Sequence, residues 1–443
     1  MIVAAVAAVA AGVPDWQTSA MRAFEFPMKP KPSLDGLELV AGNGLLHRRL
    51  FLAGGAAILG AGIPLLTARA GPVVPGAPLT GYGERSAHEA AVQRTVGAMP
   101  GAAGTGASRT PLERLEGIIT PSALHFERHH NGVPAINPAQ HQLLIHGLVK
   151  RPLLFSMDAL LRYPAVSRFL FIECAGNSGA NLAPEAPALS CGGLHGLVSC
   201  SEWTGVPLSI LLDEASVLPE GRWLLAEGAD AAAMSRSVPV VKGMDDALIA
   251  LYQNGERLRP ENGYPVRLLL PGYEGNMSVK WLHRLKVTAS PTMTRDETSR
   301  YSDLMADGRA LQFTFPMAVK SVITSPSGGL AMQGPGLYQI SGLAWTAAGR
   351  IRRVEVSADG GRSWGEAALS DPALPTAFTR FRMAWQWNGG PAVLQSRAID
   401  EAGSVQPSRV EYLAEPAARS RYHNNSIQSW GVSAAGEVAN VYA

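Results

Sequence analysis

A cysteine at the end of an apolar run is the residue best placed to do chemistry. The segment FIECAGNSGANL puts Cys174 after a run of strand length, and the small or polar residues of AGNSG follow it. A thiol at such a junction can be held rigidly, and thiolates suit soft or high-valent metals. The small residues leave room for a bulky ligand. The alternative is a buried structural cysteine, because cysteine is among the most buried residue types.

Strands and helices mix around this cysteine. SRFLFIE (167–173) and PVRLLL (265–270) are short apolar runs that predict strands. LSILLDEAS (208–216) and DDALIALYQNGE (245–256) have helical spacing and predict helices. Between Ile118 and Pro291 the combination predicts a mixed α/β domain rather than a regular βαβ array.

The last third of the chain has a different pattern. After Thr314 come four strand-like runs with turn residues between them, QISGLAWT, RIRRVEVSADGGRSW, FRMAWQW and VLQSRAID. The second run alternates apolar and polar residues before Asp359-Gly360, which predicts a hairpin because the turn needs positive φ. An antiparallel sandwich of immunoglobulin type is expected. The predicted fold class is therefore α+β, a mixed α/β domain followed by an all-β sandwich.

Length and composition agree with this organisation. A chain of 443 residues is too long for one typical core, so two domains are expected. Its 47% hydrophobic and 17% charged residues are typical of a globular protein. With 38 Lys and Arg against 36 Asp and Glu, the net charge of +2 does not indicate nucleic acid or an anionic membrane as a partner, so any basic site must be local.

The N-terminal part reads as an export signal. Arg48 and Arg49 precede an apolar stretch (50–66) that contains glycines and ends near Ala68-Arg69-Ala70, the pattern of a cleavable twin-arginine signal. Residues 1–70 are therefore assigned to an N-terminal extension and signal, and the Gly-, Ala- and Pro-rich residues 71–110 to an extended arm. A periplasmic protein without a stable membrane anchor is expected; an uncleaved anchor or a chance Arg pair is the alternative.

The cysteine segment resembles the molybdenum-ligating CAGN stretch of the sulfite oxidase family, and further matches follow in order along the chain. The resemblance implies an oxidoreductase with a molybdenum-molybdopterin cofactor and Cys174 as the protein ligand to the metal. It also implies that residues 111–310 form the molybdopterin-binding domain. Residues 311–443, which include DGGRSW, would form an immunoglobulin-like dimerisation domain, so a homodimer is expected.

The family's pocket residues carry over motif by motif. FERHHNGVP resembles the stretch in which Arg128 and His130 would line the molybdenum pocket, with Phe126 and His129 beside the pterin. ETSRYSD matches the stretch whose tyrosine faces the metal's oxo group, which is Tyr301 here. The implied catalytic residues are thus Cys174, Tyr301, Arg128 and His130.

Two further motifs resemble the cofactor-binding stretches. EGAD places a cofactor contact on Asp230, and NGYPVRLLLPGYEGNMSVKWLHRLKV follows the phosphate-binding stretch. A guanidinium and an ammonium that converge make charge-assisted bonds, as the pterin phosphate requires. Surface solvation is the alternative for the arginine of PVRLLL, although an apolar run demands a partner for it. The implied contacts in the phosphate-binding stretch are Asn262, Arg267, Ser278, Val279 and Lys280.

The chain also departs from the vertebrate-type pattern. Ser178 and Gly179 stand where two arginines follow CAGN, and the loss of an anion-binding cation argues against free sulfite as substrate. No CxxCH haem motif occurs, so electrons must leave through a separate partner. The export signal and the tail YHNNSIQSW resemble the sulfane dehydrogenases of this family. That resemblance implies oxidation of sulfane sulfur on a carrier protein during thiosulfate oxidation, with a c-type cytochrome as electron acceptor.

Other interpretations stay open. The chain could be a sulfite dehydrogenase acting on free sulfite, a methionine sulfoxide reductase of the same superfamily, or a cofactor-free scaffolding subunit. Cys191 and Cys200 could form a bridge in an oxidising compartment, which sequence alone does not decide. Arg421 precedes the tail motif and could reach the pocket, but its alignment is not secure.

Overall fold

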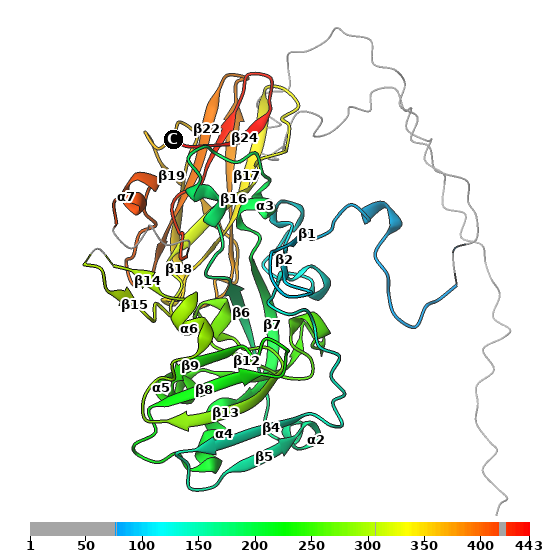
Figure 1. The fold of residues 1–443 in the computed structure, drawn as a ribbon. Helices are drawn as coiled ribbons and strands as arrows, with labels where there is room; N and C mark the ends of the chain where they lie inside the picture. Colours follow the sequence, from blue (N-terminus) through cyan, green and yellow to red (C-terminus); the bar gives the residue numbers. More distant parts are fainter. Residues whose placement is uncertain (1–75, 77, 306, 416–421) are drawn as a thin grey trace, which may run out of the picture. The chain divides into compact units, whose positions relative to one another are not determined.

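The computed structural model describes residue 76 and residues 78–305, 307–415 and 422–443 (Figure 1). The export signal predicted around Arg48 and Arg49 lies outside the described residues, as does Arg421. Within the described ranges, no helix combines the length and apolar character that crossing a membrane requires.

A five-stranded sheet with two helices packed on it forms one part of the first domain. Its strand order is β5-β4-β13-β8-β9, and only the β4–β13 pair is parallel. Helices α4 (Leu208–Ala215) and α5 (Val240–Asp245) pack on this sheet (Figure 1). Helix α4 buries residues at helical spacing, which confirms the helix predicted there. The strands are β4 (Gln142–Gly147), β5 (Leu153–Ser156), β8 (Trp223–Gly228), β9 (Ser235–Pro239) and β13 (Leu282–Thr288).

A second sheet carries the cysteine segment. Its order is β11-β10-β7-β6, and β12 also pairs with β10. Strand β6 (Val166–Glu173) pairs along its whole length with β7 (Val198–Pro207) and ends at the residue before Cys174. Strand β12 (Arg267–Leu269) lies within the predicted run 265–270, and β6 likewise confirms the strand predicted at 167–173. Strands β10 (Leu248–Gln253) and β11 (Glu256–Arg257) complete the sheet.

The helix predicted over residues 245–256 is wrong. Leu248–Gln253 form β10, a central strand that pairs with β7 and β12. All but one of its residues are buried, so its apolar side chains do not alternate with polar ones. Periodicity alone cannot distinguish such a fully buried strand from a helix, and sheet pairing with distant segments decides the outcome.

The extended arm predicted for residues 71–110 is only partly correct. Residues 78–94 contain one short 3-10 turn at Ala87–Glu89, but β1 (Thr95–Ala98) and β2 (Gly106–Arg109) form a hairpin. Strand β2 also pairs with β3 (Glu127–His129), which carries Arg128. The hairpin has little apolar content, and within it Ala107 is the buried hydrophobic residue, so its strands left no hydrophobic pattern to read.

The second domain consists of two antiparallel sheets, as the sequence predicts. One has the order β16-β17-β21-β20 and the other β19-β18-β22-β23-β24. The hairpin predicted at Asp359-Gly360 joins β18 and β19, with positive φ at Gly360 and Gly361. The strands are β16 (Lys320–Ser325), β17 (Gly336–Trp345), β18 (Ile351–Ser357), β19 (Gly365–Glu366), β20 (Ala368–Leu369), β21 (Thr379–Trp387), β22 (Ala392–Asp400), β23 (Ser429–Val432) and β24 (Val438–Val441).

The remaining helices and one hairpin lie in the connections. Helix α2 follows β5, α3 precedes β7, α6 precedes the β14–β15 hairpin, and α7 follows β22 (Figure 1). Their bounds are α2 (Met157–Leu160), α3 (Cys191–His195), α6 (Arg295–Ser299), α7 (Arg409–Ala414), β14 (Asp303–Leu304) and β15 (Ala310–Leu311).

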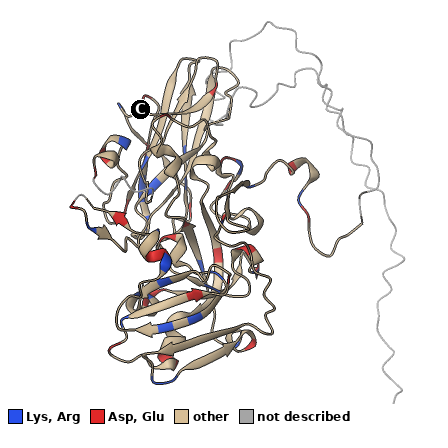
Figure 2. Ribbon diagram, in the orientation of Figure 1, with Lys and Arg blue, Asp and Glu red and all other residues tan. Residues whose placement is uncertain are grey.

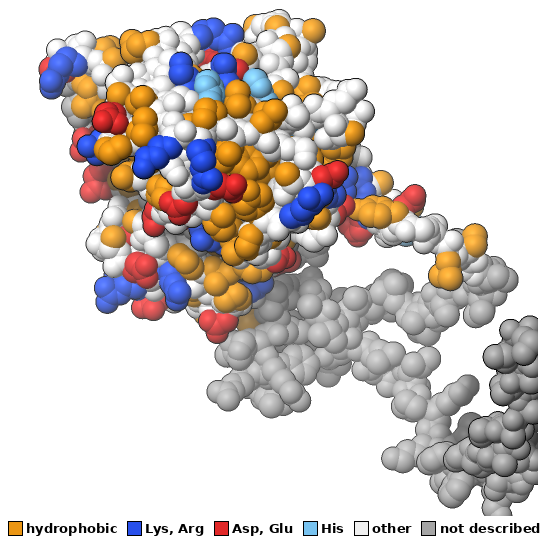
Figure 3. All heavy atoms as spheres, turned by 90° about the horizontal axis from the view of Figure 1, so that it is seen from below, with side chains coloured by type: hydrophobic (Ala, Val, Ile, Leu, Met, Phe, Trp, Pro, Cys, Tyr) orange, Lys and Arg blue, Asp and Glu red, His pale blue; other side chains and the backbone are white. Residues whose placement is uncertain are grey.

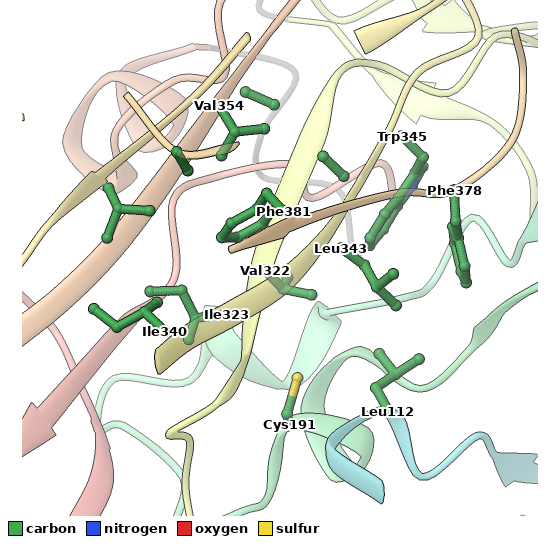
Figure 4. Close-up of a cluster of buried hydrophobic side chains, with 14 of the residues drawn as sticks. Leu112, Cys191, Val322, Ile323, Ile340, Leu343, Trp345, Val354, Phe378 and Phe381 are labelled. Carbon is green, nitrogen blue, oxygen red and sulfur yellow. The ribbon is translucent and has the colours of Figure 1, made fainter. Parts of the chain in front are cut away.

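The two domains share one apolar core. Leu112, Phe171 and Cys191 of the first domain belong to the same buried cluster as the sandwich residues Val322 and Phe381. Figure 4 shows Cys191 and Leu112 beside side chains of the sandwich. The cysteine-bearing sheet is therefore packed against the second domain and is not linked to it by chain connectivity alone.

Charged residues of both signs are distributed along the ribbon of both domains (Figure 2). Seen from below, the described surface interleaves Lys and Arg with Asp, Glu and hydrophobic side chains (Figure 3). This distribution agrees with the small net charge of +2. The surface charges therefore do not mark a binding site, and the charged residues that could bind a ligand are those in the interior.

Candidate active site

The loop after β6 holds Cys174 in a tight turn. The amide N–H of Cys174 donates to the carbonyl of Leu197 at 2.9 Å, and its own carbonyl accepts from the amide of Asn177 at 2.9 Å. The side-chain oxygen of Asn177 accepts from the amide of Leu197 at 3.1 Å, which ties the turn to the segment before β7. The rigid junction inferred from sequence is thus built by backbone bonds on both sides of the thiol.

One cavity brings the predicted site residues together. It contains about 720 Å³ of space between the lining atoms, the open solvent at its mouth included. All the residues named from sequence as catalytic or cofactor-binding line it. They are Phe126, Arg128, His129, His130, Cys174, Asp230, Asn262, Arg267, Ser278, Val279, Lys280 and Tyr301.

Arg267, the first residue of β12, is a buried cation that lines this cavity. It is 4% exposed, and its two terminal nitrogens donate to the carbonyls of Asn262 and Ser278, each at 2.8 Å. Its Nε is buried without a partner, and its guanidinium lies over the ring of Trp203. Burial lowers the pKa of Arg267 to about 9, because its partners are neutral groups.

Lys280 is a second cation beside it. Its ammonium bonds to the ring nitrogen Nδ1 of His129 at 2.8 Å and to the carbonyls of Glu261 at 3.1 Å and Arg128 at 3.3 Å. Burial lowers the pKa of Lys280 well below its ordinary value, and the positive charge of Arg267 lowers it further. The acceptors of both cations are backbone carbonyls and a ring nitrogen rather than carboxylates.

This pair of cations fits a bound phosphate. A buried guanidinium and a half-buried ammonium that hydrogen-bond to neutral groups are unfavourable as they stand, and an anion near both would supply the missing charge. A phosphate oxygen could also accept from the unpartnered Nε of Arg267. The residues present therefore fit the phosphate group of a pterin cofactor.

The thiol of Cys174 lines the same cavity, together with Arg128, His130 and Tyr301. The hydroxyl of Tyr301 lies 3.5 Å from Nε2 of His130, and a guanidinium nitrogen of Arg300 lies 3.4 Å from its Nδ1. Burial and the nearby charge of Arg128 lower the pKa of His130 to about 4, so the ring is neutral at neutral pH. Burial raises the pKa of the Cys174 thiol, while Arg128 opposes that shift. A bound metal cation would reverse it, because coordinating thiols lose their proton.

Tyr301 is enclosed by residues that sequence reasoning missed. The guanidinium of Arg236 lies 4.7 Å from the centre of its ring, and the ring of Tyr422 lies 5.5 Å away, centre to centre. Arg236 is fully buried and bonds to Glu274 at 3.1 Å. Burial raises the pKa of Tyr301, and the proximity of Cys174 raises it further. The phenol therefore stays protonated throughout the physiological range.

Further pocket residues were also missed, and most of them adjoin the motifs. His125 and Trp281 are neighbours of predicted residues, and the ring of Trp281 lies 4.4 Å from the ammonium of Lys280. Asn276 lines the cavity with both atoms of its side-chain amide buried and unpartnered. Buried polar atoms are normally satisfied, so this amide is free to bind a ligand. Arg236 had no such local signal. Tyr422 opens the tail motif YHNNSIQSW, but the sequence did not show that this motif reaches Tyr301.

The other two cysteines are separate from this cavity. Cys191 and Cys200 are free thiols, both fully buried in the shared core. Burial raises the pKa of Cys200 to about 12 and raises that of Cys191 well above its ordinary value. The bridge left open from sequence is not formed, and the two sulfurs act as apolar packing groups.

Comparisons with known proteins place this geometry in a family. Residues 130–295 match the oxidoreductase molybdopterin binding domain, and residues 312–429 match the Mo-co oxidoreductase dimerisation domain. The second match supports the predicted dimer. The sulfite oxidase of Gallus gallus is 31% identical over 330 residues, which cover 68% of this chain and 71% of that protein.

Two other known proteins are also similar to this chain. The nitrate reductase [NADH] of Solanum lycopersicum is 31% identical over 351 residues, or 68% of this chain, but the chain spans only 38% of that enzyme. The crystal structure of the sulfane dehydrogenase SoxCD from Paracoccus pantotrophus matches with a TM-score of 0.82 and 45% identity, covering 86% of this chain and 99% of that one. The fold class and the molybdenum-molybdopterin cofactor of an oxidoreductase agree with the two family matches, the sulfite oxidase and the sulfane dehydrogenase. The chain belongs to the sulfite oxidase family of molybdopterin-dependent oxidoreductases.

Proposed function

We propose that this chain is the molybdenum-containing subunit of a periplasmic sulfane dehydrogenase. It oxidises sulfane sulfur bound to a carrier protein during thiosulfate oxidation and passes the electrons to a c-type cytochrome. The observation that carries the proposal is the single cavity that is lined by Cys174 and by the two cations Arg267 and Lys280. The 45% identity to a sulfane dehydrogenase, over nearly the whole of that chain, supports this substrate class over others in the family.

In this proposal different lining residues bind different parts of the cofactor. Arg267 and Lys280 hold the phosphate group of the cofactor. Phe126 and His129 border the pterin ring. The residues that line the pterin and its phosphate-bearing side chain are Asn262, Ser278, Val279 and Asp230. Cys174 binds the molybdenum. When bound, the cofactor supplies two-electron redox chemistry at the substrate sulfur, and the protein positions and shields the reacting atoms.

Three side chains handle charge and protons at the substrate. Arg128 supplies a fixed positive charge beside the thiol. Tyr301 keeps its proton because burial raises its pKa, so its hydroxyl donates a hydrogen bond to substrate. His130 is neutral because its pKa lies at about 4, and its Nδ1 accepts from Arg300, so its Nε2–H faces that hydroxyl oxygen, 3.5 Å away, as a donor.

The position of Ser178 bears on the choice of substrate. Its hydroxyl bonds to Nδ1 of His195 at 2.7 Å and accepts from Lys320 at 2.6 Å, so it is committed to the domain interface. The cation that vertebrate-type relatives carry after CAGN is thereby replaced with a buried structural group. A pocket with less positive charge is less suited to a small dianion such as sulfite and suits sulfur held on a larger carrier.

The test compares two substrates in one assay. The purified, cofactor-loaded protein should reduce cytochrome c with a carrier protein bearing a cysteine-bound sulfane sulfur, and only slowly with sulfite alone. Cys174→Ser should abolish both activities while size-exclusion chromatography still shows a dimer. Rapid cytochrome reduction by free sulfite, without the carrier, would instead identify a sulfite dehydrogenase. Activity retained in Cys174→Ser would refute the site.

The location has its own test. A periplasmic extract should contain a mature chain beginning near Gly71, as the signal around Arg48 and Arg49 predicts. Intact-mass spectrometry measures this directly. A mature chain that begins well before Gly71, or protein confined to the cytoplasm, would contradict export by a cleaved twin-arginine signal.

A further inference from the structure

A lysine of the second domain is buried behind the cysteine loop. Lys320, the first residue of β16, is 1% exposed. Its ammonium donates to Oε1 of Glu173 at 3.0 Å, to Oγ of Ser178 at 2.6 Å and to the carbonyl of Asn424 at 2.8 Å. An ammonium has three protons, so its donor capacity is used completely. Lysine is almost never fully buried unless it is paired, which makes this position a specific one.

Two of the three acceptors bracket Cys174. Glu173 precedes the cysteine and Ser178 closes the loop that follows it. The Glu173 carboxylate also accepts from Nδ2 of Asn177 at 2.9 Å and from the indole N–H of Trp345 at 2.7 Å. One ammonium therefore ties both ends of the thiol-bearing loop to the same point on the sandwich.

The third acceptor belongs to the chain segment that reaches the loop from the second domain. Asn424, whose carbonyl accepts from Lys320, donates from its own amide to the carbonyl of Ser178 at 3.1 Å. The neighbouring amide of His423 donates to the carbonyl of Ala175 at 2.8 Å. The loop is thus held at its start, its middle and its end by residues of the second domain.

This network fixes geometry more than it adds stability. The free energy of desolvating a buried ion pair cancels much of its electrostatic attraction, so the Lys320–Glu173 pair adds little net stability. A fully satisfied buried polar network, in contrast, specifies one arrangement of its members. The arrangement specified here is that of the loop carrying the thiol.

We infer that Lys320 is a positioning residue for Cys174, through which the second domain sets the direction of the thiol toward the metal. The inference rests on the proposed ligation of molybdenum by Cys174. It gives the second domain a role in the active site in addition to dimerisation. A thiol displaced by about 1 Å should lower turnover by about 100-fold, the usual scale for such misplacement.

The experiment uses the full-length, cofactor-loaded protein with Lys320→Met, and Lys150→Met, an exposed lysine, as the matched control. We expect kcat to fall by about 100-fold while KM stays within about threefold. The thiolate-to-molybdenum absorption band and the electron paramagnetic resonance g values of the one-electron-reduced enzyme should shift. Lys150→Met should match the wild type in every measurement.

Ser178→Ala covers the case in which Lys320→Met does not fold. It removes one of the three acceptors but keeps the charge pair, so the same spectroscopic shifts should appear at smaller size. A folded Lys320→Met protein that loses molybdenum while the control retains it also supports the inference. The inference is overturned if folded Lys320→Met has unchanged spectra and a kcat within twofold of wild type. If Lys320→Met does not fold, the same result in Ser178→Ala overturns the inference. If Cys174→Ser leaves the absorption band unaltered, the ligation itself is wrong, which is a distinguishable failure.

Discussion

Lys280→Met tests whether the paired cations exist to hold an anion. Methionine is close to lysine in length and lacks the charge, so the packing against Trp281 is largely kept. A hydrogen bond involving a charged group contributes about 1.5–3 kcal/mol, which corresponds to roughly a 10- to 150-fold loss of cofactor affinity. In the cofactor-free protein the substitution removes repulsion by Arg267 and a desolvated charge. The stability of that form should therefore be unchanged or slightly higher.

The measurement separates these two effects. Molybdenum content after extended dialysis reports cofactor retention, and melting temperatures of the cofactor-loaded and cofactor-free proteins report stability. We expect faster molybdenum loss and a smaller gap between the two melting temperatures, with the change confined to the loaded form. Lys286→Met, at an exposed position of β13, is the control. Equal destabilisation of both forms would mean that Lys280 supports the fold itself, and the anion-site reasoning would be refuted.

Three further predictions follow from the same cavity. Tyr301→Phe should lower kcat by about 100-fold or more in steady-state assays while molybdenum content stays at one per chain, because only proton handling is lost; activity equal to wild type would exclude that role. Asn276→Ala should weaken cofactor retention about fivefold, the scale of one neutral hydrogen bond, measured by the same dialysis; unchanged retention would mean that its amide does not bind the ligand. Cofactor removal should make stability depend on pH, because the pKa of Lys280 is lowered in the folded protein. Below the ordinary lysine pKa the unfolded chain therefore binds more protons than the folded chain. The melting temperature of the cofactor-free form should fall as the pH drops from 10 toward the lowered pKa of Lys280. Lys280→Met should remove most of that dependence.

Local patterns predicted strands well where one end of the strand leads to a distinctive motif. The run 167–173 has a single clear interpretation and forms β6. The run 245–256 does not, because a strand buried on both faces carries no alternation, and β10 acquires its identity only from β7 and β12. The β1–β2 hairpin was missed for the opposite reason, since its strands bury too little apolar surface to leave a pattern.

The site was accessible to sequence reasoning to the extent that it lies in contiguous motifs. HFERHH and SVKW each contribute neighbouring residues to the cavity, so identifying one residue leads to the next, and CAGN contributes Cys174. Arg236 and Lys320 lie in strands, and nothing in their immediate neighbours shows that their charge is buried. Their partners, Glu274 and Glu173, are 38 and 147 positions away. Such pairs are determined by how the sheets pack together, which one sequence does not reveal.

The apolar cluster common to both domains limits how the protein can be engineered. Trimming the chain before β16 to obtain a minimal catalytic fragment would expose Phe171, Cys191 and Cys200 to water and leave the Glu173 carboxylate without its lysine. Such a fragment would have an exposed hydrophobic patch and an unpaired carboxylate, and we expect it to aggregate rather than bind its cofactor. Shorter versions suitable for biosensing or electrode attachment must therefore keep the sandwich, and deletions belong in the region before β1.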